Sequence, residues 1–157
     1  ETVAAVGARL RRAREVGGSI GVLSARRVPQ CDHLLAVDAS AHAVEAARAR
    51  LQGVAGVRVE RRSVPRELPA GPFDLIVCSE VLYYWDPPGL AELWRDLRGA
   101  LAPGGSLLAV HWRGPVRHYP QGGDAVHAAL RADAGDLAVG LSLTRPAFRL
   151  DRFDRAA

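Results

Sequence analysis

The chain has 157 residues, 48 % of them hydrophobic, which suits one domain with a single core. Its 21 basic residues are all arginine and its net charge is +4. The arginines are spread along the chain without interleaved aromatic residues, a pattern that does not favour a nucleic-acid partner. No apolar stretch approaches the roughly 18 residues of a membrane span, and the N-terminus lacks a signal-peptide profile. We therefore expect a cytoplasmic protein without a membrane partner.

The first half of the chain is expected to alternate helices and strands. Val3, Val6 and Leu10 recur at helical spacing, which predicts a helix over residues 1–12. The next expected elements are a short strand at 13–16, a short helix after Gly21, a strand at 33–38, a helix over about 40–52 that Ser40 caps, and a strand around Val57 and Val59.

The second half continues this alternation. Its expected elements are a buried strand at 73–78, a helix over about 87–101 that Asp86 caps, a strand at 106–111, a helix near 123–133, and strands at about 138–144 and 147–153. This order predicts a Rossmann-like, doubly wound α/β fold: a mostly parallel seven-stranded sheet with helices on both faces and an antiparallel C-terminal hairpin.

The cysteines and histidines do not indicate a metal site. Cys31 and Cys78 lie far apart in the sequence, and we expect both to be buried, reduced thiols. The five histidines and two cysteines show no compact metal-ligand spacing, so no metal is expected.

A glycine-rich turn between Gly17 and Gly21 follows the first expected strand. Glycine lets the backbone approach a ligand closely, and Asp38 at the end of the next strand is placed to accept hydrogen bonds from ribose hydroxyls. Glu15 would repel a pyrophosphate and attract a cation, which favours S-adenosylmethionine over NAD. Arg14, inside the same strand, has no explanation in this pattern.

Other polar and aromatic residues fall on the same expected sheet edge, each with two interpretations. Glu80 either accepts a proton or caps the next helix, and His111 either accepts a proton or is a structural histidine bound to the backbone. Tyr83, Tyr84 and Trp85 either pack against the next helix or include at least one ring that lines a pocket for a sulfonium or ammonium group.

Four segments, EVGGSIG, AVDAS, FDLIVCSEVLYYW and LAPGGSLLAVHWR, resemble the class I S-adenosylmethionine-dependent methyltransferases, and this resemblance covers nearly the whole chain. The segments GGSIGVLSA, SEVLYYW and HWRGPVRHYPQGGDAVHAAL are similar to the branch that contains the bacterial nodulation protein S N-methyltransferases. The resemblance implies a single methyltransferase domain over 1–157. Because relatives close the site with upstream helices, we expect its N-terminal lid region to be absent or truncated.

Residue by residue, the resemblance implies a methyl-donor site with Glu15 near the ammonium and Asp38 on the ribose. The full expected cofactor set is Glu15, Gly17, Gly18, Ser19, Gly21, Asp38, Ala39, Ser40, Ser63, Val64, Ser79, Glu80 and Val81. The expected catalytic residues are His111 and Glu80, and the expected substrate contacts are Tyr83, Tyr84, His111 and Tyr119.

The function expected from this site is N-methylation of a small amine-bearing metabolite such as a sugar amine. O-methylation of a sugar or natural product is the alternative, and a non-catalytic methyltransferase-like partner subunit is a third interpretation. The sequence leaves a homodimer open.

Overall fold

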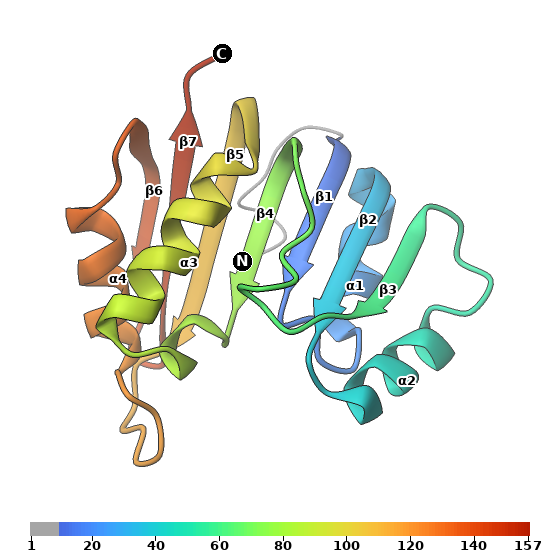
Figure 1. Ribbon diagram of the computed structural model, residues 1–157, viewed down its shortest axis with the longest axis horizontal. Coiled ribbons are helices and arrows are strands. Elements are labelled where there is room, and N and C mark those ends of the chain that lie inside the picture. The colour runs from blue at the N-terminus through green and yellow to red at the C-terminus, as the bar shows by residue number, and fades with distance from the viewer. Residues whose placement is uncertain (1–9) are drawn as a thin grey trace.

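A computed structural model describes residues 10–157 as a central seven-stranded sheet flanked by helices (Figure 1). The strand order is β3-β2-β1-β4-β5-β7-β6. The strands are β1 (Leu10–Val16), β2 (Cys31–Asp38), β3 (Val57–Arg61), β4 (Phe73–Ser79), β5 (Leu101–Trp112), β6 (Leu137–Thr144) and β7 (Phe148–Arg155). The helices are α1 (Val22–Arg27), α2 (Ala41–Arg50), α3 (Pro87–Gly99) and α4 (Gly123–Ala132), with short 3-10 helices η1 (Val28–Gln30) and η2 (Leu82–Tyr84).

The pairing of the strands confirms the predicted fold. Strands β1 to β5 run parallel to one another, whereas β7 runs antiparallel to both β5 and β6. The arrowhead of β7 therefore points opposite to those of the parallel strands in Figure 1. The predicted C-terminal hairpin is β6 and β7, and β7 inserts between β6 and β5.

Two predicted boundaries are wrong. The helix predicted over 1–12 lies outside the described residues up to position 9, and Leu10, Arg11 and Arg12 belong to β1. Leu10 pairs with Cys31 of β2, so at this residue the sheet overrides the helical spacing. Strand β5 starts at Leu101 instead of 106, because Leu101 pairs with Phe73 before an irregularity in the β4 and β5 register.

The core lies on both faces of the sheet. Helices α3 and α4 cover one face and α1 lies behind the sheet (Figure 1). Helix α3 buries the stripe Leu90, Leu93, Trp94 and Leu97, which recurs at helical spacing. Asp86 accepts a hydrogen bond from the Gly89 N–H at 3.0 Å, which confirms the predicted cap.

Arg14 is fully buried in central strand β1. Its guanidinium donates to the carbonyl oxygen of Pro69 at 2.5 Å and lies 4.6 Å from the ring centroid of Phe73. Burial lowers the pKa of Arg14 to about 10. The side chain thus ties the loop between β3 and β4 to the sheet, which accounts for an arginine at a fully buried position of this strand.

Both cysteines are buried and neither forms a disulfide, as predicted. Within residues 10–157 no group of three or more histidine, cysteine or acidic side chains is placed to hold a metal ion. Within the same residues no helix is long and apolar enough to cross a membrane.

Candidate functional site

A cleft of about 550 Å³ opens at the carboxyl ends of β1, β2 and β4, where the topology of a doubly wound sheet places ligands. Its walls come from the turns after these three strands, the loop after β3 and the segment around η2. The lining residues are Val16, Gly17, Ser19, Val37, Asp38, Ala39, Ser40, Arg62, Val64, Ser79, Glu80, Val81, Tyr83, Tyr84 and Trp85.

The glycine-rich turn is held tightly against β2 and β4. The N–H groups of Gly17 and Gly18 both donate to the carbonyl oxygen of Val37, at 2.9 and 3.0 Å. Gly17 has a φ of 75°, and a Cβ added there would lie 2.8 Å from Val81. Only glycine fits this position, because both the backbone conformation and the close approach exclude a side chain.

Asp38 ends β2 with its carboxylate already oriented. Its Oδ2 accepts a hydrogen bond from the Ser19 N–H and its Oδ1 accepts one from the Ser40 N–H, each at 2.9 Å. Each carboxylate oxygen has further acceptor capacity, and Asp38 lines the cleft. The side chain is therefore preorganised to accept hydrogen bonds from the hydroxyl groups of a ligand.

Glu15 lies beneath a second cleft of about 330 Å³. Its side chain is almost fully buried and accepts a hydrogen bond from the Ser24 hydroxyl at 2.7 Å. Burial raises the pKa of Glu15 to about 7, although Ser24 and the positive charge of Arg27 oppose the rise. A cationic group in this cleft would stabilise the carboxylate.

Glu80 lines both clefts and follows the last residue of β4. It has a positive φ of 56°, a conformation uncommon for a residue with a side chain. Its Oε2 accepts a hydrogen bond from the Tyr83 hydroxyl at 2.5 Å. Burial, followed by the contact with Glu80, raises the pKa of Tyr83 above its ordinary value. The carboxylate is thus oriented where the two clefts meet.

Three tyrosines, Tyr83, Tyr84 and Tyr119, form a tyrosine wall beside Glu80. The rings of Tyr83 and Tyr119 stack with centroids 4.8 Å apart, and Tyr84 meets Tyr119 edge to face at 4.6 Å. The hydroxyls of Tyr84 and Tyr119 lie 3.3 Å apart, and this contact is the main cause that raises the pKa of Tyr84 to about 12. The wall joins η2 to the loop before α4.

His111 lies behind this wall and is fully buried. Its Nε2 accepts a hydrogen bond from the Leu82 N–H at 3.1 Å, and its Nδ1 lies 3.0 Å from Nε2 of His127. Burial and the neighbouring His127 lower the pKa of His111 to about 3. With both ring nitrogens engaged, the geometry argues against proton transfer or substrate contact at His111 and favours the structural interpretation.

Most of the predicted site residues line one of the two clefts. Those in neither lining are Gly21, Ser63, His111 and Tyr119. Gly21 supports the turn by donating its N–H to the Gly18 carbonyl at 3.0 Å, and the Ser63 N–H donates to Glu67 at 2.7 Å. The lining residues that sequence reasoning missed are Val16, Ile20, Val22, Leu23, Arg26, Val37 and Arg62. Trp85, which the sequence left with two interpretations, lines the larger cleft. Arg62 directly precedes the predicted Ser63, so proximity to that position was the available signal.

The sheet order, the glycine-rich turn and the acid that ends β2 place the protein in the class of α/β proteins that hold a nucleoside cofactor at the carboxyl edge of a parallel sheet. Within this class, the sequence pattern of the methyltransferase domain family matches residues 15–107. The chain belongs to this family.

Comparison with individual proteins supports this assignment. Over 97 residues the chain is 33 % identical to nodulation protein S of Rhizobium tropici, an alignment that spans 61 % of this chain and 41 % of that protein. A solved structure from Pseudomonas syringae, assigned as a methyltransferase, is 41 % identical with a TM-score of 0.85, covering 98 % of this chain and 94 % of that one.

The structure of the N-methyltransferase NodS from Bradyrhizobium japonicum WM9 with S-adenosyl-L-homocysteine is 22 % identical. It superimposes with a TM-score of 0.86 over 99 % of this chain and 83 % of that chain. At this identity the similarity shows a shared fold.

Proposed function

We propose that the protein methylates an amine nitrogen of a small polar acceptor, with S-adenosylmethionine as the methyl donor. The observation that carries the proposal is the Glu80 carboxylate, which Tyr83 orients at the junction of the two clefts. Membership of the methyltransferase domain family supports methyl transfer, and the relatives named as nodulation protein S and N-methyltransferase NodS support a nitrogen acceptor.

The residues of both clefts fit this donor. Asp38 can accept hydrogen bonds from the ribose hydroxyls, since the two backbone N–H groups that it already binds leave acceptor sites free. Within residues 10–157 no basic side chain is bonded to the buried Glu15 carboxylate, and the donor's ammonium would satisfy it. Gly17 packs closely on Val81 and has no side chain, so the backbone of the turn can contact the donor between Asp38 and Glu15.

The donor, when bound, supplies a methyl group on a positively charged sulfur, and its transfer leaves a neutral thioether. The chain contributes alignment and the exclusion of water, because this displacement needs little acid catalysis. An ammonium nitrogen has no free electron pair, so an acceptor bound in that form must lose a proton before its nitrogen–carbon bond forms and the sulfur–carbon bond of the donor breaks. Glu80 accepts that proton, directly or through one water.

The tyrosine wall favours an amine over a neutral hydroxyl as the acceptor. Aromatic faces attract cations, so an ammonium form of the acceptor is drawn toward Tyr84 and the adjacent Glu80 carboxylate. An alcohol gains neither of these attractions.

The test is transfer of a labelled methyl group from S-adenosylmethionine to a matched panel of amines and alcohols, with wild-type protein and Glu80→Gln. We expect N-methylated product with wild type and a fall of about 100-fold in kcat for Glu80→Gln, within the range for loss of a general base. Glu92→Gln, an exposed carboxylate of α3, is the matched control and should keep wild-type kcat.

Each alternative has its own outcome. Transfer to alcohols alone would overturn the amine assignment and favour O-methylation. If calorimetry shows no binding of S-adenosylmethionine and no methyl is transferred, the protein is a non-catalytic partner subunit. Glu80→Gln with unchanged kcat would remove Glu80 as the proton acceptor.

A further inference from the structure

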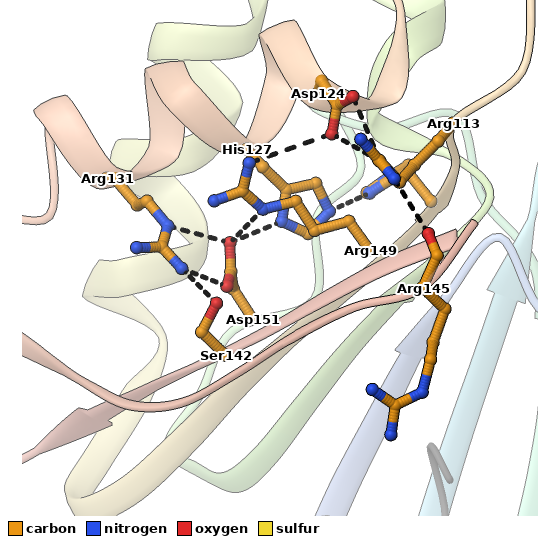
Figure 2. A network of polar contacts seen from close by, with 9 residues as sticks. Arg113, Asp124, His127, Arg131, Ser142, Arg145, Arg149 and Asp151 are labelled. Atoms are coloured by element: carbon orange, nitrogen blue, oxygen red, sulfur yellow. Dashed lines mark hydrogen bonds and ion pairs between the residues drawn. The ribbon is translucent and has the colours of Figure 1, made fainter. Parts of the chain in front are cut away.

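A chain of buried side chains runs from β7 to η2 behind the tyrosine wall. Asp151 of β7, His127 of α4 and His111 of β5 are all fully buried. The Oδ2 of Asp151 lies 2.7 Å from Nδ1 of His127, and the two imidazoles meet at 3.0 Å. Figure 2 shows His127 and Asp151 at the centre of a polar network that arginines surround. We call the three residues the imidazole chain.

One arrangement of protons satisfies every contact in the imidazole chain. The Leu82 N–H can only donate, so Nε2 of His111 must accept and its proton must sit on Nδ1. Nε2 of His127 then accepts from His111, and its Nδ1–H donates to the Asp151 carboxylate. A backbone amide does not release its proton, so the chain does not relay protons to the cleft. It orients the groups at its ends.

The Asp151 end is anchored by arginines. Arg131 donates to both carboxylate oxygens, at 2.5 and 3.0 Å, and the Nε of Arg149 lies 3.4 Å from Oδ2 (Figure 2). Burial alone would raise the pKa of Asp151, but hydrogen bonds from His127 and Arg131 hold it well below its ordinary value. The carboxylate therefore stays charged and keeps the His127 tautomer in place.

The other end holds the segment that carries Glu80. Leu82 begins η2, and its N–H is fixed by His111, while the Glu80 N–H donates to the Val110 carbonyl at 2.9 Å. The Tyr83 ring also packs edge to face on the His111 ring, with centroids 5.2 Å apart. His111 thus fixes both the backbone of η2 and the ring whose hydroxyl orients Glu80.

We propose that His127 and Asp151 are positioning residues that act through His111 on the Leu82 N–H, and so hold Tyr83 and Glu80 in the geometry for methyl transfer. The catalytic consequence rests on the proposed function. The tautomers and the Leu82 hydrogen bond do not depend on the proposed function, and both can be measured without any substrate.

The first experiment is nitrogen-resolved NMR of the imidazoles in the wild-type protein, with hydrogen exchange of the Leu82 amide. We expect the proton on Nδ1 of both His111 and His127 and a protected Leu82 amide. A proton on Nε2 of His111, or an unprotected Leu82 amide, would overturn the inference whatever the activity. If the expected tautomers are found but no acceptor is methylated, the proposed function has failed instead.

The second experiment compares His111→Phe with His111→Gln. Phenylalanine keeps a ring but offers Leu82 no acceptor, so we expect exchange at Leu82 about tenfold faster and kcat about tenfold lower, with the affinity for S-adenosyl-L-homocysteine unchanged. Glutamine can place an oxygen near the Nε2 position and should restore most of the protection and kcat. Equal losses in both variants, in step with their melting temperatures, would show a merely structural histidine.

A third pair covers the case in which His111→Phe does not fold. Asp151→Asn removes the charge at the far end of the imidazole chain, and Asp154→Asn makes the same change on the same strand outside it. We expect faster Leu82 exchange and a several-fold lower kcat for Asp151→Asn alone. Indistinguishable results for the two variants would overturn the role of Asp151.

Discussion

The buried Glu15 predicts that binding of the methyl donor depends on pH. Its side chain is 2 % exposed and its pKa is raised from 4.5 to about 7, chiefly by burial. Below pH 7 the group is therefore mostly a neutral acid, which cannot pair with an ammonium. If the bound donor holds Glu15 as a carboxylate, its affinity should follow the ionised fraction of Glu15 in the free protein.

The magnitude follows from that pKa. With a pKa of about 7, roughly a tenth of Glu15 is ionised at pH 6 and roughly nine tenths at pH 8, so affinity should rise about tenfold between them. Calorimetry with S-adenosyl-L-homocysteine measures this directly. Glu15→Gln should bind weakly and with the same affinity at both pH values, whereas Glu45→Gln, an exposed carboxylate of α2, should behave as wild type.

The same group links pH to the stability of the ligand-free protein. Because the folded-state pKa lies above the unfolded value, the folded protein holds this proton more tightly, and stability falls as pH rises from 4.5 to about 7. The free energy of unfolding should lose up to about 3 kcal/mol from this site over that range. Glu15→Gln should remove this part of the loss because glutamine does not titrate. Its amide oxygen can still accept the hydrogen bond from Ser24. A wild-type affinity that is the same at pH 6 and 8, or an equal pH slope in Glu15→Gln, would refute the reasoning.

Three further substitutions test other parts of the structure. Gly17→Ala forces a side chain onto a positive φ and against Val81. We expect the free energy of unfolding in urea to fall by about 2 kcal/mol and S-adenosyl-L-homocysteine to bind at least tenfold more weakly. Wild-type values for both would contradict the tight turn. Tyr83→Phe removes the donor to Glu80 and should lower kcat about tenfold with donor affinity unchanged, and an unaltered kcat would show that this hydrogen bond does not orient the base. Trp94→Phe removes the indole N–H that donates to the Asp133 carbonyl at 2.7 Å, and the free energy of unfolding in urea should fall by about 1 kcal/mol. An unchanged urea midpoint would contradict this prediction.

The sequence by itself determined the sheet and the edge where the site lies. Apolar periodicity, the Gly17–Gly21 turn and the acid Asp38 are local signals, because strands, helices and tight turns depend mainly on nearby residues. Since the carboxyl ends of parallel strands meet at one edge, these signals also placed most of the cleft residues together. The helical spacing that included Leu10 was misleading at that residue, because pairing with β2 overrode it.

The roles of individual buried polar groups were decided only by the tertiary structure. Arg14 has its partner in Pro69, 55 positions along the chain, and His111 meets His127 and Leu82 from two other elements. The sequence left His111 with two interpretations, because a histidine at a strand end looks the same whether its nitrogens face a ligand or a backbone amide. That choice depends on how α4 and η2 pack over β5, which brings together groups that no local pattern connects.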